Sequence, residues 1–183
     1  MRQTTTDTPE NLIHITMFGE FSIRVGDKQI KDTVARTHQL WHLIEYLIAY
    51  RNKSISQEEL IEILWPEGDI DNPANALKNL VYRVRTTLHS HGLPHAKEMI
   101  VYSRGAYRWN NSLPCTVDTE EFDKILAQAE SEELTSAQHV RRLMEAVELY
   151  KGDFLPGAKF ESWVVPIASN YRSQYFKCVY KVL

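Results

Sequence analysis

The chain has 183 residues, which is enough for two small domains or one large one. Hydrophobic residues make up 43% and charged residues 25%, as in ordinary soluble globular proteins. Glu45 and Arg51 interrupt the apolar runs, so no segment is expected to span a bilayer. Residues 1–11 lack the apolar core of a signal peptide and are expected to form a disordered tail. Cys115 and Cys178 are too few and too isolated for a disulfide framework, which favours a reducing cytoplasm.

The net charge of −3 argues against a nucleic-acid partner until it is divided along the chain. Residues 72–110 contain six Lys and Arg and a single acidic residue, Glu98, and carry +5. Residues 1–71 carry −5 and residues 111–183 carry −3. One basic segment between acidic flanks is typical of a protein in which a single surface meets phosphate.

The first elements are predicted to be strands. Residues 13–18 and 21–25 alternate in β-branched and aromatic side chains, and a Gly-Asp turn leads to residues 28–30. A helix is then predicted from an apolar stripe with helical spacing at Leu40, Leu43, Ile44, Leu47 and Ile48.

Two further helices carry clear start signals. Ser56 and Glu59 have the spacing of a capping box, and Trp65-Pro66 would end that helix before a polar loop at residues 67–71. Asn72-Pro73 supplies an N-cap and a proline at the first helical position, and Gly92 would end the third helix. The apolar stripe of this third helix consists of Leu77, Leu80, Val81, Val84 and Leu88.

A hairpin follows the third helix, because residues 99–103 and 106–109 read as strands joined at Arg104-Gly105. This order predicts a winged helix-turn-helix domain with a small N-terminal β-sheet over residues 12–112. From residue 113 to 183 the pattern is helical, with a second capping box expected at residues 118–121. The predicted fold class is α+β, in which the winged helix precedes an all-α, TPR-like helical repeat.

The polar face of the third helix is the candidate site. It lacks carboxylates, and Asn and Arg are the side chains that pair bidentately with adenine and guanine in a major groove. Arg104 at the hairpin tip could enter a minor groove. The predicted DNA-binding residues are Asn75, Lys78, Asn79, Tyr82, Arg83, Arg85, Thr86 and Arg104. A solvated polar face is the alternative for the helix, and an ordinary turn arginine is the alternative for Arg104.

Several sequence strings carry a family resemblance. Residues 80–88 (LVYRVRTTL) followed by residues 103–109 (SRGAYRW) resemble the third helix and wing of OmpR/PhoB-type winged helices, and residues 54–65 resemble that family's second helix. Residues 146–156 (AVELYKGDFLP) and 161–163 (ESW) resemble the bacterial transcriptional activator domain. Together they resemble the N-terminal part of a SARP-type transcriptional regulator.

The resemblance implies a transcription activator that binds double-stranded DNA. Asn75, Asn79, Arg83 and Arg85 match groove or phosphate positions of the family's third helix, and Arg104 matches its minor-groove arginine. The resemblance also implies that the loop at residues 67–71 contacts RNA polymerase. Two departures stand out: Ala106 replaces a second glycine in the wing, and the activator domain is usually longer than three helices, so the chain resembles a fragment or a short member.

Other chemistry is weakly signalled. His38 and His42 have the i, i+4 spacing of metal ligands without an evident third ligand, and His89, His91 and His95 are better explained by helix-end capping or phosphate approach. No catalytic motif is present, so the chain is predicted to be neither an enzyme nor dependent on a metal or cofactor. The alternative function is a protein-interaction adaptor whose winged helix no longer binds DNA. An apolar terminal-helix face (Tyr175, Phe176, Val179, Tyr180 and Leu183) predicts either a homodimer or a missing continuation.

Overall fold

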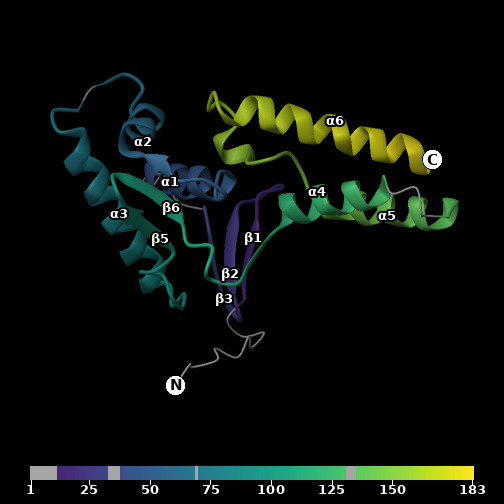
Figure 1. The fold of residues 1–183 in the computed structure, drawn as a ribbon, viewed down its shortest axis with the longest axis horizontal. Helices are drawn as coiled ribbons and strands as arrows, with labels where there is room; N and C mark the ends of the chain where they lie inside the picture. The colour runs from purple at the N-terminus through teal and green to yellow at the C-terminus, as the bar shows by residue number, and fades with distance from the viewer. Residues whose placement is uncertain (1–11, 33–37, 69, 131–134) are drawn as a thin grey trace. The chain divides into compact units, whose positions relative to one another are not determined.

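The computed structural model describes residues 12–32, 38–68, 70–130 and 135–183 (Figure 1). The elements, in chain order, are β1 (Ile13–Thr16), β2 (Ser22–Val25), β3 (Lys28–Lys31), α1 (His38–Ala49), β4 (Ile55–Ser56), α2 (Gln57–Leu64), α3 (Pro73–Ser90), β5 (Ile100–Ser103), β6 (Ala106–Trp109), β7 (Cys115–Val117), α4 (Asp118–Ala129), α5 (Ser136–Leu149), the 3-10 helix η3 (Pro156–Ala158) and α6 (Val164–Val182). The predicted α+β class is confirmed, but the structure adds two strands that the sequence did not predict, β4 and β7, and β7 lies in the segment expected to be helical. Within the described ranges, no helix combines the length and apolarity needed to cross a membrane.

Backbone contacts divide the chain into two compact units. The first unit consists of Met1–Ile13 and Arg24–Cys115, and the second of His14–Ile23 and Thr116–Leu183. The strands form a four-stranded sheet in the order β3-β2-β1-β7 and a three-stranded sheet in the order β4-β6-β5.

The first unit contains the winged helix. Helices α1, α2 and α3 contact one another, and α1 also contacts β6. The predicted apolar stripe of α3 is buried along its whole length, since Leu77, Val84 and Leu88 are fully enclosed. Burial of one stripe fixes the rotation of α3 about its axis and leaves its opposite face free for solvent or a ligand.

The hairpin that forms the wing closes with a two-residue turn. Ser103 pairs with Ala106, and the two residues between them, Arg104 and Gly105, have φ values of +52° and +81°. Two positive φ values are the signature of a turn that matches the twist of antiparallel strands. Ala106, which stands where the family has a second glycine, continues as an ordinary strand residue.

The second unit is built around α5, which packs against both α4 and α6. An aromatic cluster centres on Phe18, whose ring lies 5.4 Å from Phe122, 5.0 Å from Tyr150 and 5.1 Å from Tyr171, measured between ring centroids. Phe18 also pairs with Phe154 across an isolated antiparallel bridge. These contacts explain why His14–Ile23, which lie far from the helices in sequence, belong to the helical unit.

The prediction of a capping box at residues 118–121 is wrong. The N-cap of α4 is Val117, which has no side-chain cap, and Asp118 lies inside the first turn. The carboxylate of Asp118 instead accepts hydrogen bonds from the backbone amides of Met17 and Phe18 at 2.8–3.0 Å. Burial raises the pKa of this carboxyl, although the amide donors oppose that shift. Asp118 therefore joins α4 to the end of β1.

The two compact units do not follow the expected division of the chain at residue 112, because His14–Ile23 lie with the helices. The functional boundary between a winged-helix domain (12–112) and a helical domain (113–183) remains a proposal.

The starts of three other helices, α2, α5 and α6, can be compared with their sequences. Ser56 caps α2 by accepting from the Glu59 amide at 3.1 Å, but the Glu59 carboxylate accepts from the Tyr46 hydroxyl at 2.7 Å, so the expected return half of that capping box is replaced. A full capping box opens α5, where Thr135 and Gln138 bond each other reciprocally. Pro166 lies in the first turn of α6, where a proline does not interrupt the hydrogen bonds of the helix.

Candidate nucleic-acid interface

The exposed face of α3 is set by its cap and its buried stripe. The side chain of Asn72 accepts a hydrogen bond from the Asn75 amide at 3.1 Å, and Pro73 occupies the first turn. These interactions begin the helix at the position expected from the sequence. The candidate residues on this face that are exposed to solvent are Asn75, Lys78, Asn79, Tyr82, Arg83 and Thr86.

Tyr82 is notable because 69% of it is accessible to solvent. A large aromatic side chain in the middle of a helix costs free energy when it is left in water. Its neighbours on the same face are the amide Asn79 and the cation Arg83, both exposed. A polar, aromatic and cationic surface of this kind fits base edges and phosphates.

Arg85 differs from Arg83 although the two are only two residues apart. The guanidinium of Arg85 is half-buried and donates from Nη2 to the backbone oxygen of Ile100 at 2.8 Å. Its Nε is buried without a hydrogen-bond partner among the described residues. Arg85 therefore ties α3 to strand β5, whereas Arg83 points away from the unit.

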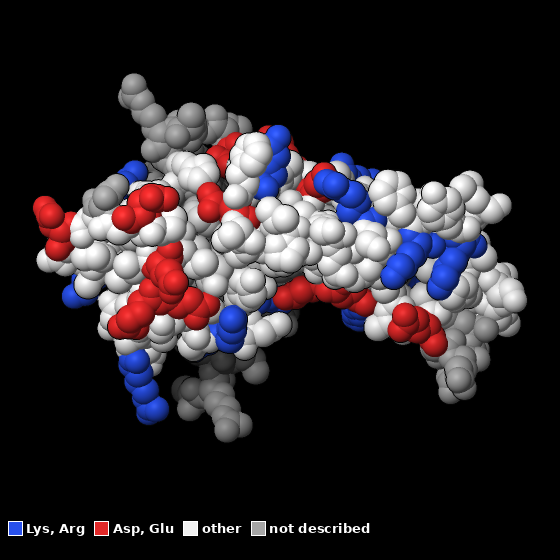
Figure 2. Space-filling model, turned by 90° about the horizontal axis from the view of Figure 1, so that it is seen from above, with Lys and Arg blue, Asp and Glu red and all other residues white. Residues whose placement is uncertain are grey.

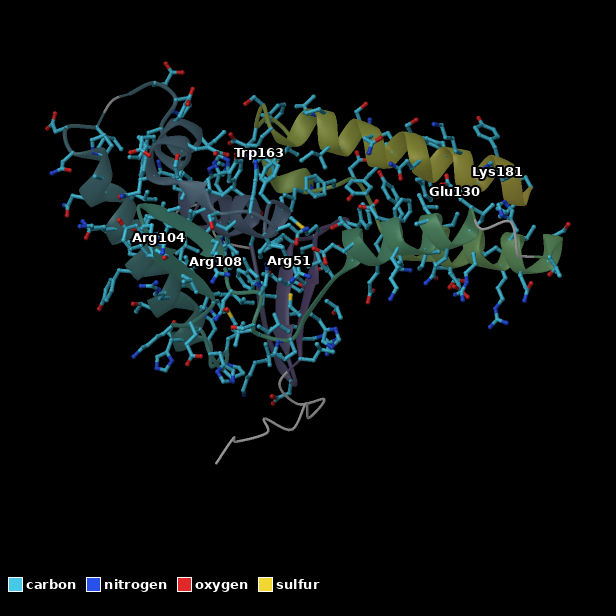
Figure 3. The ribbon with its side chains drawn as sticks, in the orientation of Figure 1. Arg51, Arg104, Arg108, Glu130, Trp163 and Lys181 are labelled. Carbon is cyan, nitrogen blue, oxygen red and sulfur yellow. The ribbon has the colours of Figure 1, made fainter. Side chains whose placement is uncertain are left out.

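The exposed cations of the site are available to a ligand. Within the described parts of the chain, no carboxylate forms an ion pair with Lys78, Arg83 or Arg104. Unpaired cations on one surface attract phosphate without first breaking an internal salt bridge. Figure 3 labels Arg104 at the wing tip and Arg108 farther along the same hairpin.

The wing tip is anchored to the start of α2. The Gln57 amide donates to the Gly105 backbone oxygen at 3.1 Å, and the Gln57 side chain donates to the Tyr102 hydroxyl, also at 3.1 Å. The Tyr102 ring in turn lies 4.7 Å from the Tyr107 ring. Because two bonds hold the tip, Arg104 projects from a fixed turn rather than from a long loop. Sequence reasoning missed Gln57 and Tyr102, since only the hairpin register brings them together.

Acidic side chains lie on another face of the first unit. Glu58, Glu62 and Glu67 are exposed on α2 and in the loop that follows it. Figure 2 shows red acidic side chains gathered at the left end of the molecule, where Figure 1 draws α2. Phosphate would be repelled there, so these carboxylates disfavour a nucleic-acid contact through α2.

The histidines near the end of α3 have structural partners. The ring Nδ1 of His91 lies 2.8 Å from the Thr87 backbone oxygen, so it donates to one of the last carbonyls of the helix. His95 lies 3.5 Å from the Glu98 carboxylate. The expectation that this group caps a helix end is confirmed for His91.

The comparisons with known proteins agree with this geometry. Residues 31–108 match the family described as "Transcriptional regulatory protein, C terminal". This segment, which is less than half of the chain, contains α1, α2, α3 and nearly all of the wing, and it is similar to the winged helices of that family. No curated protein matches the sequence.

A solved structure extends the fold beyond the winged helix. EmbR of Mycobacterium tuberculosis, in complex with a low-affinity phosphopeptide, matches 91% of this chain with a TM-score of 0.69 and 17% sequence identity. The chain spans 43% of the length of that structure. At this level of identity, the match shows that the two proteins share a fold.

Proposed function

We propose that the chain is a transcription regulator that binds double-stranded DNA in a sequence-specific manner and activates transcription. The winged-helix family match supports a transcriptional role. The observation that carries the DNA-binding proposal is the exposed face of α3, which is free of carboxylates and holds Asn75, Asn79 and Arg83 opposite a fully buried stripe.

In this proposal α3 lies in the major groove. Asn75 and Asn79 would pair with adenine, and Arg83 with guanine, because these side chains offer the matching donors and acceptors. Lys78 would contact a phosphate. Arg85 is half-buried and bonded to the Ile100 carbonyl, so it would position the wing against α3 rather than read a base.

Arg104 would enter the adjacent minor groove. Its side chain is exposed, and its backbone is held in a left-handed turn whose neighbour Gly105 is bonded to Gln57. A fixed tip lowers the ordering entropy that a flexible arginine loop would lose on binding. A narrow, A·T-rich minor groove attracts arginine most strongly, so the wing would favour such sequences.

The remaining surfaces would serve protein partners in the cytoplasm. The loop at residues 67–71, next to the acidic α2 face, would contact RNA polymerase, as in the family it resembles. The TPR-like helical segment would join two copies, so that two winged helices occupy repeated half-sites.

Selection of bound duplexes from a random pool tests the proposal. We expect a consensus containing two half-sites, and we expect the Arg83→Ala variant to lose preference at one position in each half-site. If no sequence is enriched in the pool after several rounds, although the protein is folded, the DNA-binding proposal is overturned and the protein-interaction adaptor is favoured instead.

A further inference from the structure

Thr86 lies on the exposed face of α3, and its hydroxyl proton is committed within the helix. Its Oγ1 donates a hydrogen bond of 2.9 Å to the backbone oxygen of Tyr82, one turn earlier. A threonine that bonds back to its own helix in this way gains little stability from the bond. The bond fixes the side chain and prevents the hydroxyl from donating to a ligand. The methyl group is therefore what Thr86, which is exposed to solvent, offers at the surface.

The neighbouring side chains on this face differ from Thr86 in this respect. Within the described residues, the side chains of Asn75, Asn79 and Arg83 form no hydrogen bond, so their donors and acceptors remain available. Tyr82 and Thr86 are both exposed and are four residues apart, which places them side by side on the helix surface. An aromatic ring and a methyl group thus form a small apolar patch on a face that is otherwise polar.

We propose that Thr86 recognises a thymine through the C5 methyl group of the base. This inference rests on the DNA-binding function proposed above and assigns a base to one further residue of α3. Among the four bases of unmodified DNA, only thymine presents a methyl group in the major groove. Apolar contact, including contact with a threonine methyl group, is how proteins distinguish that base edge. Asn75, Asn79 and Arg83 would then read bases by hydrogen bonds, and Thr86 by contact with a methyl group.

The position of Thr86 along α3 locates the thymine within the site. Thr86 follows Arg83 by three residues, which correspond to about 4.5 Å along the helix axis. Successive base pairs are about 3.4 Å apart. The thymine should therefore lie within about one base pair of the guanine that Arg83 would contact. The ring of Tyr82 would stand beside the same base pair and help to keep water away from the two methyl groups.

Replacement of this thymine by uracil tests the contact, because uracil lacks only the C5 methyl group and forms the same base pair. The probe is the duplex selected by the wild-type chain, with thymine or uracil at the position next to the guanine. We expect the wild-type chain to bind the uracil duplex about fourfold more weakly, as for the loss of one buried methyl group. Uracil in place of a thymine outside both half-sites should leave the affinity unchanged.

Two variants at residue 86 show whether Thr86 makes this contact. Thr86→Ser keeps the hydroxyl and removes the methyl group, so it should bind the thymine and uracil duplexes equally. Thr86→Val keeps a methyl group and removes the hydroxyl, so it should retain the difference of about fourfold. Thr87→Ser, which removes a methyl group from the half-buried neighbour on another side of α3, should also retain it. Circular dichroism and the thermal midpoint report whether each variant is folded.

Two results would overturn this inference and leave sequence-specific DNA binding intact. One is a wild-type chain that binds the thymine and uracil duplexes equally while preferring both to random DNA. The other is a Thr86→Ser variant that still prefers thymine, since the preference would then come from the shape of the DNA or from another side chain. If the selection enriches no sequence at all, the proposed function and this inference fail together.

Discussion

Arg83 and Arg85 share a helix and a charge but not an environment. Arg83 is exposed and unpaired within the described residues, whereas Arg85 donates to the Ile100 carbonyl from a half-buried position. Arg83→Ala should therefore weaken binding to the selected site by about 1–3 kcal/mol and relax sequence preference. Arg85→Ala should lower the free energy of unfolding by about 1–3 kcal/mol, since a hydrogen bond from a charged donor is lost.

Duplex titration and urea unfolding of both variants measure these effects side by side. Equal losses of affinity on specific and random DNA for Arg83→Ala would contradict a base-reading role. An Arg85→Ala variant that unfolds like the wild type would contradict a positioning role for that arginine.

A test of Arg104 needs a replacement residue that tolerates the left-handed backbone conformation at this position. Its φ of +52° is strained for most side chains, and Asn adopts such a conformation more readily than Ala. Arg104→Asn should therefore remove the charge while keeping the turn. We expect affinity to fall more for sites with A·T-rich flanks than for sites with G·C-rich flanks. Losses that do not depend on flank composition would argue against a minor-groove contact.

The stability of the second unit should depend on pH through the carboxyl group of Asp153. Its hydrogen bonds from Arg172, and secondarily from Tyr150, hold the pKa of this carboxyl below its usual range. A lowered pKa in the folded state adds stability above the ordinary value of 3.8, and that stability is lost as the pH falls through the lowered value. The wild-type thermal midpoint should thus fall more steeply than that of Asp153→Asn as the pH falls below about 4. Parallel curves would contradict this assignment.

At the scale of the element, α3 depends on its N-cap. Asn72→Ala removes the acceptor of the Asn75 amide and should lower the free energy of unfolding by about 1 kcal/mol. The adjacent Asp71→Ala is the matched control, because Asp71 is exposed and surface substitutions of this kind change stability by less than about 0.5 kcal/mol. Chemical denaturation of the two variants distinguishes them, and equal midpoints would show that the cap contributes little.

Elements with local signals were predictable from the sequence, and those with distant partners were not. The cap and stripe of α3 lie within one segment, so the sequence predicted its start and its buried face. The Thr135–Gln138 capping box was equally local and could have been found. Asp118 was misassigned because the amides it binds lie about a hundred residues away in sequence.

The same distinction applies to the candidate site. Helical periodicity placed Asn75, Asn79 and Arg83 on the face away from the core, and their exposure agrees with it. Periodicity could not show that Arg85 reaches the Ile100 carbonyl or that Gln57 holds the wing tip, because both contacts depend on how strands and helices pack.

At the scale of the whole molecule, a net charge of −3 conceals a basic segment of +5. Three exposed cations, Lys78, Arg83 and Arg104, lie on α3 and the wing tip. The exposed carboxylates Glu58, Glu62 and Glu67 lie instead on α2 and in the loop after it. In the proposed function, this segregation would let an acidic protein bind DNA through one strip of its surface while other surfaces remain for protein partners.

The most direct test of this account is the salt dependence of DNA binding. Contact of Lys78 with a phosphate and the approach of Arg104 through the minor groove predict that the logarithm of the association constant falls with the logarithm of salt concentration with a slope of about −1 to −2 for each bound copy. Arg83→Ala should reduce that slope by about one if Arg83 contacts a phosphate and leave it nearly unchanged if it reads a base. A slope near zero, with equal affinity for selected and random duplexes, would contradict the claim that this winged helix recognises DNA.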